Sequence, residues 1–101
     1  MGTQPRLTAP TLKVLGVLMA PDTELSGADI GKLTKLPSGS LYPILLRLED
    51  AGWLHSRWEV EDPAVLGRPR RRFYKITPLG ARKVKEVARD LQPALGDFAW
   101  V

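Results

Sequence analysis

LPSGSLYPILLRLEDAGW, the sequence from Leu36 to Trp53, carries clear signals for the start and the end of a helix. Ser38 or Ser40 can cap the first turn by accepting a hydrogen bond from a free amide group. Gly52 can take the left-handed conformation that ends a helix. Four apolar residues recur between these signals at helical spacing and predict one buried face: Leu41, Ile44, Leu45 and Leu48.

The opposite face of this predicted helix carries Ser40, Pro43, Arg47 and Asp50. Pro43 would break a helix interior, but near the start its missing N–H matters little. Small side chains and free amide groups at a helix start can approach phosphates and base edges, as a DNA-recognition helix does. An ordinary amphipathic core helix has the same pattern, so this helix alone leaves both interpretations open.

The distribution of charge favours a polyanionic partner. The 101-residue chain has a formal net charge of +4, and five of its 15 lysines and arginines lie between residues 68 and 75, a run without any acid. These five cations are Arg68, Arg70, Arg71, Arg72 and Lys75. A basic patch on a small domain indicates nucleic acid first and a membrane surface second.

Composition also argues against several other classes of protein. Cysteine is absent, which excludes disulfides, thiolate catalysis and cysteine-based zinc sites and favours a cytoplasmic protein. His55 is the only histidine, so we expect no metal site. No glycine-rich phosphate loop is present and Ser38 has no histidine partner, so we expect neither an enzyme nor a cofactor. The apolar run Val14 to Ala20 is too short to span a bilayer, and we interpret it as a core helix rather than a weak signal sequence.

The remaining patterns predict a mainly α fold with a small β-hairpin, an α+β class. Thr8 caps a first helix to about residue 20, and Ser26 with Asp29 forms a capping box for a second over residues 27–35, with Ile30 and Leu33 inward. Alternating residues predict strands over 53–60 and 70–77, joined by a loop. Two short helices joined by a tight turn, followed by a basic hairpin, are typical of a winged helix-turn-helix.

A last helix is expected from Thr77-Pro78, a threonine cap followed by proline at the first helical position. Its apolar stripe has no obvious cover in a winged domain that is already complete, so we expect a second copy of the chain to cover it. Pro93 should kink or interrupt this helix. The chain would then consist of a DNA-binding domain, 1–77, and a C-terminal dimerisation helix, 78–101. The residues expected at the dimer interface are Leu15, Val84, Val87, Leu91, Leu95 and Phe98.

The sequence resembles the PadR-like family of bacterial winged-helix transcriptional regulators. The resemblance rests on two motifs, residues 36–54 with their Gly-Ser-Leu-Tyr-Pro and Arg-Leu-Glu, and residues 67–80, where an arginine-rich stretch leads into Phe73-Tyr74 and then Thr77 and Gly80. It implies a homodimeric DNA-binding repressor that often responds to a small aromatic or hydrophobic effector. It also implies that Tyr42 meets the DNA backbone.

The pattern and the resemblance together give a set of candidate DNA-binding residues: Lys35, Ser38, Gly39, Ser40, Tyr42, Arg47, Arg68, Arg70 and Arg71. Each has a simpler explanation, since the serines can merely cap a helix and Arg47 can pair with Glu49 or Asp50. The arginines of residues 68–72 can form a solvated face. Three acids on the preceding strand and loop, Glu59, Glu61 and Asp62, either hold these arginines in place or limit non-specific binding.

We therefore expect a homodimeric transcriptional regulator that represses by occupying a pseudo-palindromic operator in double-stranded DNA. A small aromatic effector is a further expected partner, and Trp100 is the candidate for its pocket because tryptophan stacks on flat ligands. Trp100 can equally be a terminal packing residue. The alternative function is a winged-helix protein-interaction module without operator specificity, which would be expected to carry an acidic or neutral wing.

Overall fold

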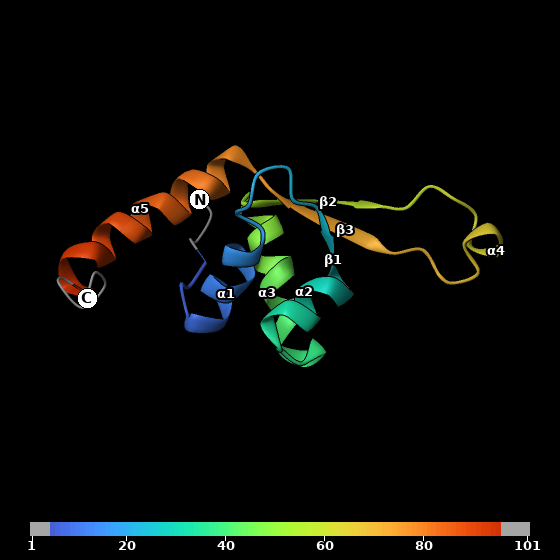
Figure 1. The fold of residues 1–101 in the computed structure, drawn as a ribbon, viewed down its shortest axis with the longest axis horizontal. Helices are drawn as coiled ribbons and strands as arrows, with labels where there is room; N and C mark the ends of the chain where they lie inside the picture. Colours follow the sequence, from blue (N-terminus) through green and yellow to red (C-terminus); the bar gives the residue numbers. More distant parts are fainter. Residues whose placement is uncertain (1–4, 96–101) are drawn as a thin grey trace.

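The computed structural model describes the backbone of residues 5–95 and the side chains of residues 5–90. Figure 1 shows a helical body from which a long hairpin extends on one side and the last helix on the other. The elements follow one another as α1 (Ala9–Val17), β1 (Leu25–Ser26), α2 (Gly27–Thr34), α3 (Ser38–Asp50), β2 (Leu54–Trp58), α4 (Pro63–Leu66), β3 (Arg72–Ile76) and α5 (Pro78–Leu95). No helix in residues 5–95 is long and apolar enough to cross a membrane.

The predicted helix caps are confirmed in three places and wrong in one. Thr8 accepts from the Thr11 amide at 3.3 Å, and Thr77 accepts from the Gly80 amide at 3.0 Å. Ser26 and Asp29 form both bonds of the capping box, at 3.1 and 3.4 Å. Neither Ser38 nor Ser40 caps α3, because the cap position is Pro37 and no side chain bonds to the first turn. The two serine hydroxyls therefore stay uncommitted to the helix start.

The turn between α2 and α3 is short because Lys35 takes a left-handed conformation, with φ of 60°. Its amide donates to the Gly31 carbonyl at 2.8 Å, and Pro37 then prevents the second helix from continuing. The Thr34 hydroxyl donates to the Ile30 carbonyl at 2.7 Å and accepts from the Leu36 amide at 3.4 Å. These bonds fix α3 directly after α2, which is the predicted helix-turn-helix.

The core lies between α1, α2, α3 and the sheet, and α3 contributes the predicted face of Leu41, Ile44, Leu45 and Leu48. Two predictions about apolar residues are wrong. Leu33 was expected to point inward, but it is 59% exposed because Gly27, Ile30 and Thr34 form the buried side of α2. Leu15 was expected at a dimer interface, but it is fully buried in the core of its own chain and has no surface for a partner.

The sheet has three antiparallel strands in the order β1-β3-β2, one more than the predicted hairpin. Leu25 pairs with Tyr74, so the short extended piece before α2 closes one edge of β3. Along the other edge Leu54 pairs with Ile76 and Trp58 with Arg72. An isolated two-stranded hairpin is marginally stable in water, so the third strand anchors the base of the hairpin to the helical body. The predicted loop between the strands contains α4, whose cap is Asp62.

The first turn of α5 is fixed against the junction between α3 and β2. The Thr77 amide donates to the Trp53 carbonyl at 3.0 Å, and the Thr77 hydroxyl donates to the Gly52 carbonyl at 2.6 Å. A Cβ on Gly80 would lie 2.3 Å from that Trp53 oxygen, so only glycine allows this approach. Beyond this turn α5 leads away from the body (Figure 1). The expected interruption at Pro93 is not found, since the helix continues to Leu95.

Replacing Leu45 with alanine tests the core. Leu45 is 1% exposed, whereas its neighbour Leu46 on the outer face is 60% exposed. We expect Leu45→Ala to lower the free energy of unfolding by about 2–5 kcal/mol, because it leaves a cavity under the helix. Leu46→Ala is the matched control and should change it by less than about 1 kcal/mol. Urea unfolding at one fixed protein concentration measures both, and equal losses would contradict the assigned faces of α3.

Candidate nucleic-acid interface

The outer face of α3 is polar and fully accessible. Ser38, Gly39, Ser40, Tyr42 and Arg47 are all exposed, on the side opposite the buried leucines. The simpler explanation for Arg47 was an ion pair with Glu49 or Asp50. Glu49 pairs with Arg72 instead, and Arg47 forms no ion pair with any described residue. Lys35, in the preceding turn, is exposed as well. The face thus presents small residues at its start and uncompensated cations near both ends.

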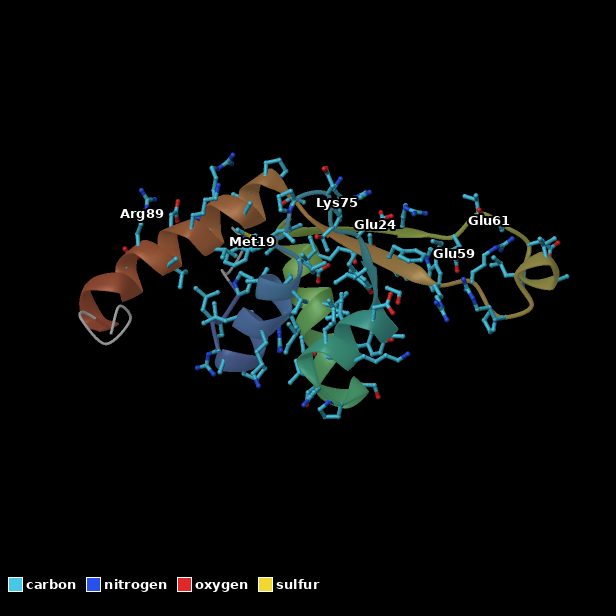
Figure 2. The ribbon with its side chains drawn as sticks, in the orientation of Figure 1. Met19, Glu24, Glu59, Glu61, Lys75 and Arg89 are labelled. Carbon is cyan, nitrogen blue, oxygen red and sulfur yellow. The ribbon has the colours of Figure 1, made fainter. Side chains whose placement is uncertain are left out.

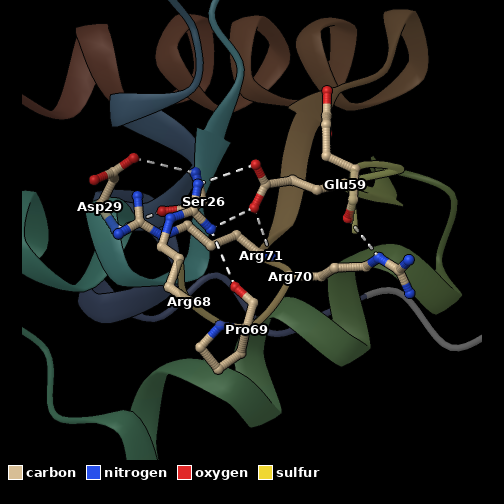
Figure 3. A network of polar contacts seen from close by, with 8 residues as sticks. Ser26, Asp29, Glu59, Arg68, Pro69, Arg70 and Arg71 are labelled. Carbon is tan, nitrogen blue, oxygen red and sulfur yellow. Dashed lines mark hydrogen bonds and ion pairs between the residues drawn. The ribbon is translucent and has the colours of Figure 1, made fainter. Parts of the chain in front are cut away.

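The wing is the part of the hairpin beyond β2 and β3, residues 59–71. Figure 3 shows Glu59 bonded to two residues of the wing, Arg68 and Arg71. The Glu59 carboxylate accepts two bonds from the Arg68 guanidinium, at 2.6 and 3.0 Å, and one from the Arg71 amide at 2.8 Å. The Nε of Arg70 donates to the Glu61 carbonyl oxygen at 2.9 Å. Glu59 therefore holds the wing in place, which is the first of the two roles considered for the acids of this region.

These bonds change the acidity of the Glu59 carboxyl group. The hydrogen-bonded Arg68 guanidinium, helped by the Arg71 amide, lowers the pKa of Glu59 from 4.5 to about 2. A carboxylate in such contact with a guanidinium stays ionised far into acid. Arg68 is thus neutralised locally and acts as part of the wing's framework. The sequence motif alone did not show which of the five cations are held by acids.

Arg72 is also committed to a structural role. Its guanidinium pairs with Glu49 of α3 at 3.2 Å and its Nε donates to the Ser56 hydroxyl at 2.9 Å. Ser56 in turn donates to Glu49. The same guanidinium lies 5.4 Å from the centre of the Trp58 ring. This network joins α3 to both hairpin strands, so it sets the angle between the outer helix face and the wing.

Arg70 and Arg71 are the cations of the wing that keep a free charge. Both are exposed, and neither forms an ion pair with an acid in the described part of the chain. Together with Tyr42 they border one hollow between α3, the start of α2 and the hairpin. Tyr42 reaches this place because residue 27 is glycine, since a Cβ there would lie 2.9 Å from the tyrosine hydroxyl. The structure thus brings three candidate residues together, Tyr42, Arg70 and Arg71.

The other candidate DNA-binding residues do not border this hollow. Lys35, Ser38, Gly39, Ser40 and Arg47 lie on the turn and on the remaining outer surface of α3. Sequence reasoning missed Glu49, Ser56 and Gly27 as residues that position the interface. Glu49 had a signal, because it is the acid of the quoted Arg-Leu-Glu motif, but its partner lies 23 residues away along the chain.

The candidate dimer residues are described only in part. Val84 is half-buried and packs against the core of its own chain, while Val87 is half-buried on the next turn of α5. The side chains of Leu91 and Leu95, and the whole of Phe98 and Trp100, lie outside the described residues. Figure 2 shows Arg89 of α5 at the opposite end of the molecule from Glu59 and Glu61 of the wing.

A helix-turn-helix followed by an antiparallel hairpin with free cations defines the class of winged-helix regulators. The sequence matches the family described as "Transcriptional regulator PadR-like family" over residues 25–86. The chain belongs to this family, which confirms the resemblance and the winged fold. Members of the family are transcription regulators and not enzymes. Among curated proteins, none matches the sequence significantly.

Solved structures with the same fold include Bacillus subtilis PadR in complex with operator DNA, with a TM-score of 0.66 and 22% identity over 80% of this chain and 48% of that one. This chain thus spans about half the length of that regulator. A PadR family transcriptional regulator from Eggerthella lenta has a TM-score of 0.63 and 27% identity, covering 76% of this chain and 69% of its own. Bordetella bronchiseptica BpsR, whose DNA binding is regulated by 6-hydroxynicotinic acid, has a TM-score of 0.66 and 21% identity, covering 83% and 55%.

The wing network predicts how the Arg71 amide responds to pH. The pKa of Glu59 in the folded protein is about 2, below its ordinary 4.5. The carboxylate therefore stabilises the wing fully above pH 4.5, and this stabilisation is lost as the pH falls towards about 2. We expect the Arg71 amide proton shift in NMR spectra to stay constant from pH 6 down to about 3.5. In Glu59→Gln this shift should differ at every pH. A transition centred near pH 4.5 would contradict the network.

Proposed function

We propose that this protein is a homodimeric transcriptional regulator that acts in the cytoplasm and represses genes by occupying a pseudo-palindromic operator. The observation that carries the proposal is the shared position of Tyr42 and the two free wing arginines beside the exposed face of α3. Family membership supports it, because the family consists of transcription regulators. The alternative, a protein-interaction module, would be expected to carry an acidic or neutral wing, whereas the described wing has two free arginines, Arg70 and Arg71.

In the proposed complex α3 lies in the major groove. Its start offers Ser38 and Ser40 hydroxyls that cap nothing, and Gly39 has no atom within 4 Å of a would-be Cβ, so the DNA backbone or base edges can approach closely. Arg47 reaches the same groove from the next turns. The wing then places Arg70 and Arg71 on adjacent phosphates or in the minor groove. Arg68, predicted as a DNA contact, is assigned instead to holding Glu59.

Two-fold symmetry follows from the proposed role of α5. The helix packs against the body as far as Val84, and Val87 continues the apolar stripe on the next turn. A second copy packed against this stripe would place two α3 helices about one DNA turn apart, on successive major grooves. The division into a DNA-binding part, 1–77, and a dimerisation helix, 78–101, is part of this proposal.

Release by a small aromatic effector completes the proposal. BpsR, with the same fold, has its DNA binding regulated by 6-hydroxynicotinic acid, which is a flat aromatic acid. Trp100 remains the candidate for such a pocket at the dimer centre. The operator complex of Bacillus subtilis PadR and the DNA complex of Staphylococcus aureus MepR support the DNA-binding part of the proposal, since both have this fold.

Selection of DNA from a random pool by the purified full chain tests the proposal. We expect an enriched sequence with two inverted half-sites whose centres lie about 10 base pairs apart. Light scattering should give a complex of two chains per DNA duplex. If no sequence is enriched, or if the bound species has one chain, the proposed function is wrong.

Arg71 provides the sharper test of the wing. Replacing Arg71 with glutamine removes a free cation, so we expect DNA affinity to fall by about fivefold or more and the salt dependence of log K to decrease by about 0.9 per subunit. Arg89→Gln is the matched control, because it removes the same charge from the opposite end of the molecule (Figure 2). Fluorescence anisotropy over a range of salt concentrations measures both. Equal changes in slope would show that net charge alone governs binding.

Val87 provides the test of dimerisation. We expect Val87→Glu to raise the dimer dissociation constant by at least about tenfold, since it replaces a buried valine in both copies with a charge. Lys85→Glu is the control on the exposed face of the same helix. Sedimentation equilibrium gives both constants, and circular dichroism checks that the variants fold. An unchanged constant for Val87→Glu would place the dimer interface elsewhere.

A further inference from the structure

The end of the wing, residues 60–67, differs in character from the arginines that follow it, and we call these residues the tip. Val60 and Val65 are 83% and 80% exposed, so neither side chain contributes to the core of its own chain. Asp62 caps α4, whereas the Glu61 carboxylate forms no ion pair with any described residue. The tip contains no lysine or arginine. It is therefore an apolar projection with a negative charge.

DNA is a poor partner for the tip. An apolar wedge can enter a minor groove, but the carboxylates of Glu61 and Asp62 would be repelled by the phosphates on either side. The proposed phosphate contacts come from Arg70 and Arg71, which follow the tip in the sequence. Exposed apolar side chains that lie together commonly mark a protein interface. The tip thus fits a protein surface that has an apolar floor and positive charge at its rim.

The same chain carries such a surface between α1 and α2. It is a groove of about 430 Å³ lined by six residues: Lys13, Gly16, Val17, Leu33, Thr34 and Lys35. Leu33 is 59% exposed, and a Cβ on Gly16 would meet no atom within 4 Å. The two lysines are exposed and form no ion pair within residues 5–90. The groove is thus open, apolar at its floor and positive at its rim.

We propose that the tip of one molecule docks in the groove of a second copy of this chain. Val65 would lie over Gly16 and against Leu33. Glu61 would pair with Lys13. The contact would cover two exposed apolar surfaces at once and bring opposite charges together, and such complementarity selects the partner and fixes its orientation.

The contact would join molecules head to tail. Figure 1 shows α4 at the end of the hairpin and α1 on the opposite side of the helical body, so the tip lies at the other end of the molecule from its own groove. Two different surfaces then meet, and each pair of molecules keeps one free tip and one free groove. Such a contact does not close on itself, so further molecules can add to it in a row. The proposed two-fold contact of α5 is closed and leaves both surfaces available.

The tip is too small to hold two molecules together by itself. Stable protein complexes bury about 1,200–2,000 Å² in total, whereas the tip is the end of one hairpin with a helix of 4 residues. The contact therefore forms mainly where other forces already hold the molecules side by side. DNA with two neighbouring operators does this, a role that rests on the proposed function. Binding to the first operator should strengthen binding to the second by about tenfold.

Disulfide crosslinking tests the contact without DNA, since the chain has no cysteine of its own. A full chain carrying both Gly16→Cys and Val65→Cys is oxidised at high concentration in a glutathione buffer and separated under denaturing conditions. We expect a ladder of linked chains that continues beyond two, because each chain offers one tip and one groove. The control carries Lys85→Cys and Val65→Cys and should link at least about fivefold more slowly. Equal rates, or products that stop at two chains, would overturn the proposal.

Cooperative binding is measured on DNA that carries two selected operators at a series of spacings, and on DNA that carries one. Gly16→Leu fills the groove from an exposed position of α1, so it should abolish the cooperativity and leave the affinity for a single operator unchanged. Gly16→Ala is the matched control, because its methyl group leaves the groove open, and it should keep the cooperativity. No cooperativity at any spacing would overturn the role on DNA. A lower single-operator affinity for Gly16→Leu would assign the groove to DNA and overturn the docking.

An exchange of charges identifies the two surfaces that meet. Lys13→Glu and Glu61→Lys should each lower the cooperativity by at least about threefold. The chain with both substitutions should regain it, because every contact joins the tip of one copy to the groove of another. Any effect of these charges on the affinity for a single operator cancels in the ratio that defines cooperativity. A double variant that is no better than the single ones would overturn the pairing.

The contact and the proposed function can fail separately. If the ladder of linked chains forms but no DNA sequence is selected, the proposed function is wrong and the contact stands. If an operator is selected but neither the ladder nor the cooperativity is found, the contact is wrong and the proposed function stands. Circular dichroism checks that each variant folds.

Discussion

The structure depends on the one-sided burial of α3. Its four buried side chains are each no more than 5% exposed and belong to one core with residues of α1, α2 and the sheet: Leu41, Ile44, Leu45 and Leu48. Burying such side chains stabilises the fold by about 1.5–3 kcal/mol each, which fixes the rotation of the helix about its axis. Once that rotation is fixed, Ser38, Tyr42 and Arg47 have to face solvent. The outer face is thus a consequence of the core.

Ion pairs then determine how the hairpin stands relative to that face. Arg72 links the sheet to Glu49 of α3, and Arg68 holds Glu59 within the wing. Exposed pairs of this kind contribute little to stability, but the hydrogen bonds of both pairs orient the groups they join, and the pair of Arg68 and Glu59 is bidentate. Neighbouring arginines therefore have different roles. Two maintain the shape of the hairpin, and two, Arg70 and Arg71, carry the charge that a polyanion would meet.

Much of the architecture could be predicted from sequence because its signals are local. The Thr8, Ser26 and Thr77 caps, the turn at Gly52 and the apolar spacing of α3 each depend on residues within one or two turns. Two of the predictions failed, one because of distant residues and one because of a neighbouring residue. Leu15 had the right spacing for a second buried face, but its own core already occupies that side. The serines at the start of α3 were good caps, yet Pro37 holds the cap position.

The sequence by itself determined the order of elements, the buried face of α3 and the basic character of the wing, because hydrophobic period, capping and net charge are properties of short segments. Only the tertiary structure decided which arginines keep a free charge, why Gly27 and Gly80 must lack a side chain, and that Tyr42, Trp58 and Tyr74 share one hollow. Those features depend on residues that lie 9 to 32 positions apart in a chain of 101, from the pair of Arg68 and Glu59 to that of Tyr42 and Tyr74. No local pattern records such distances, since they exist only after the strands have paired and α3 has packed.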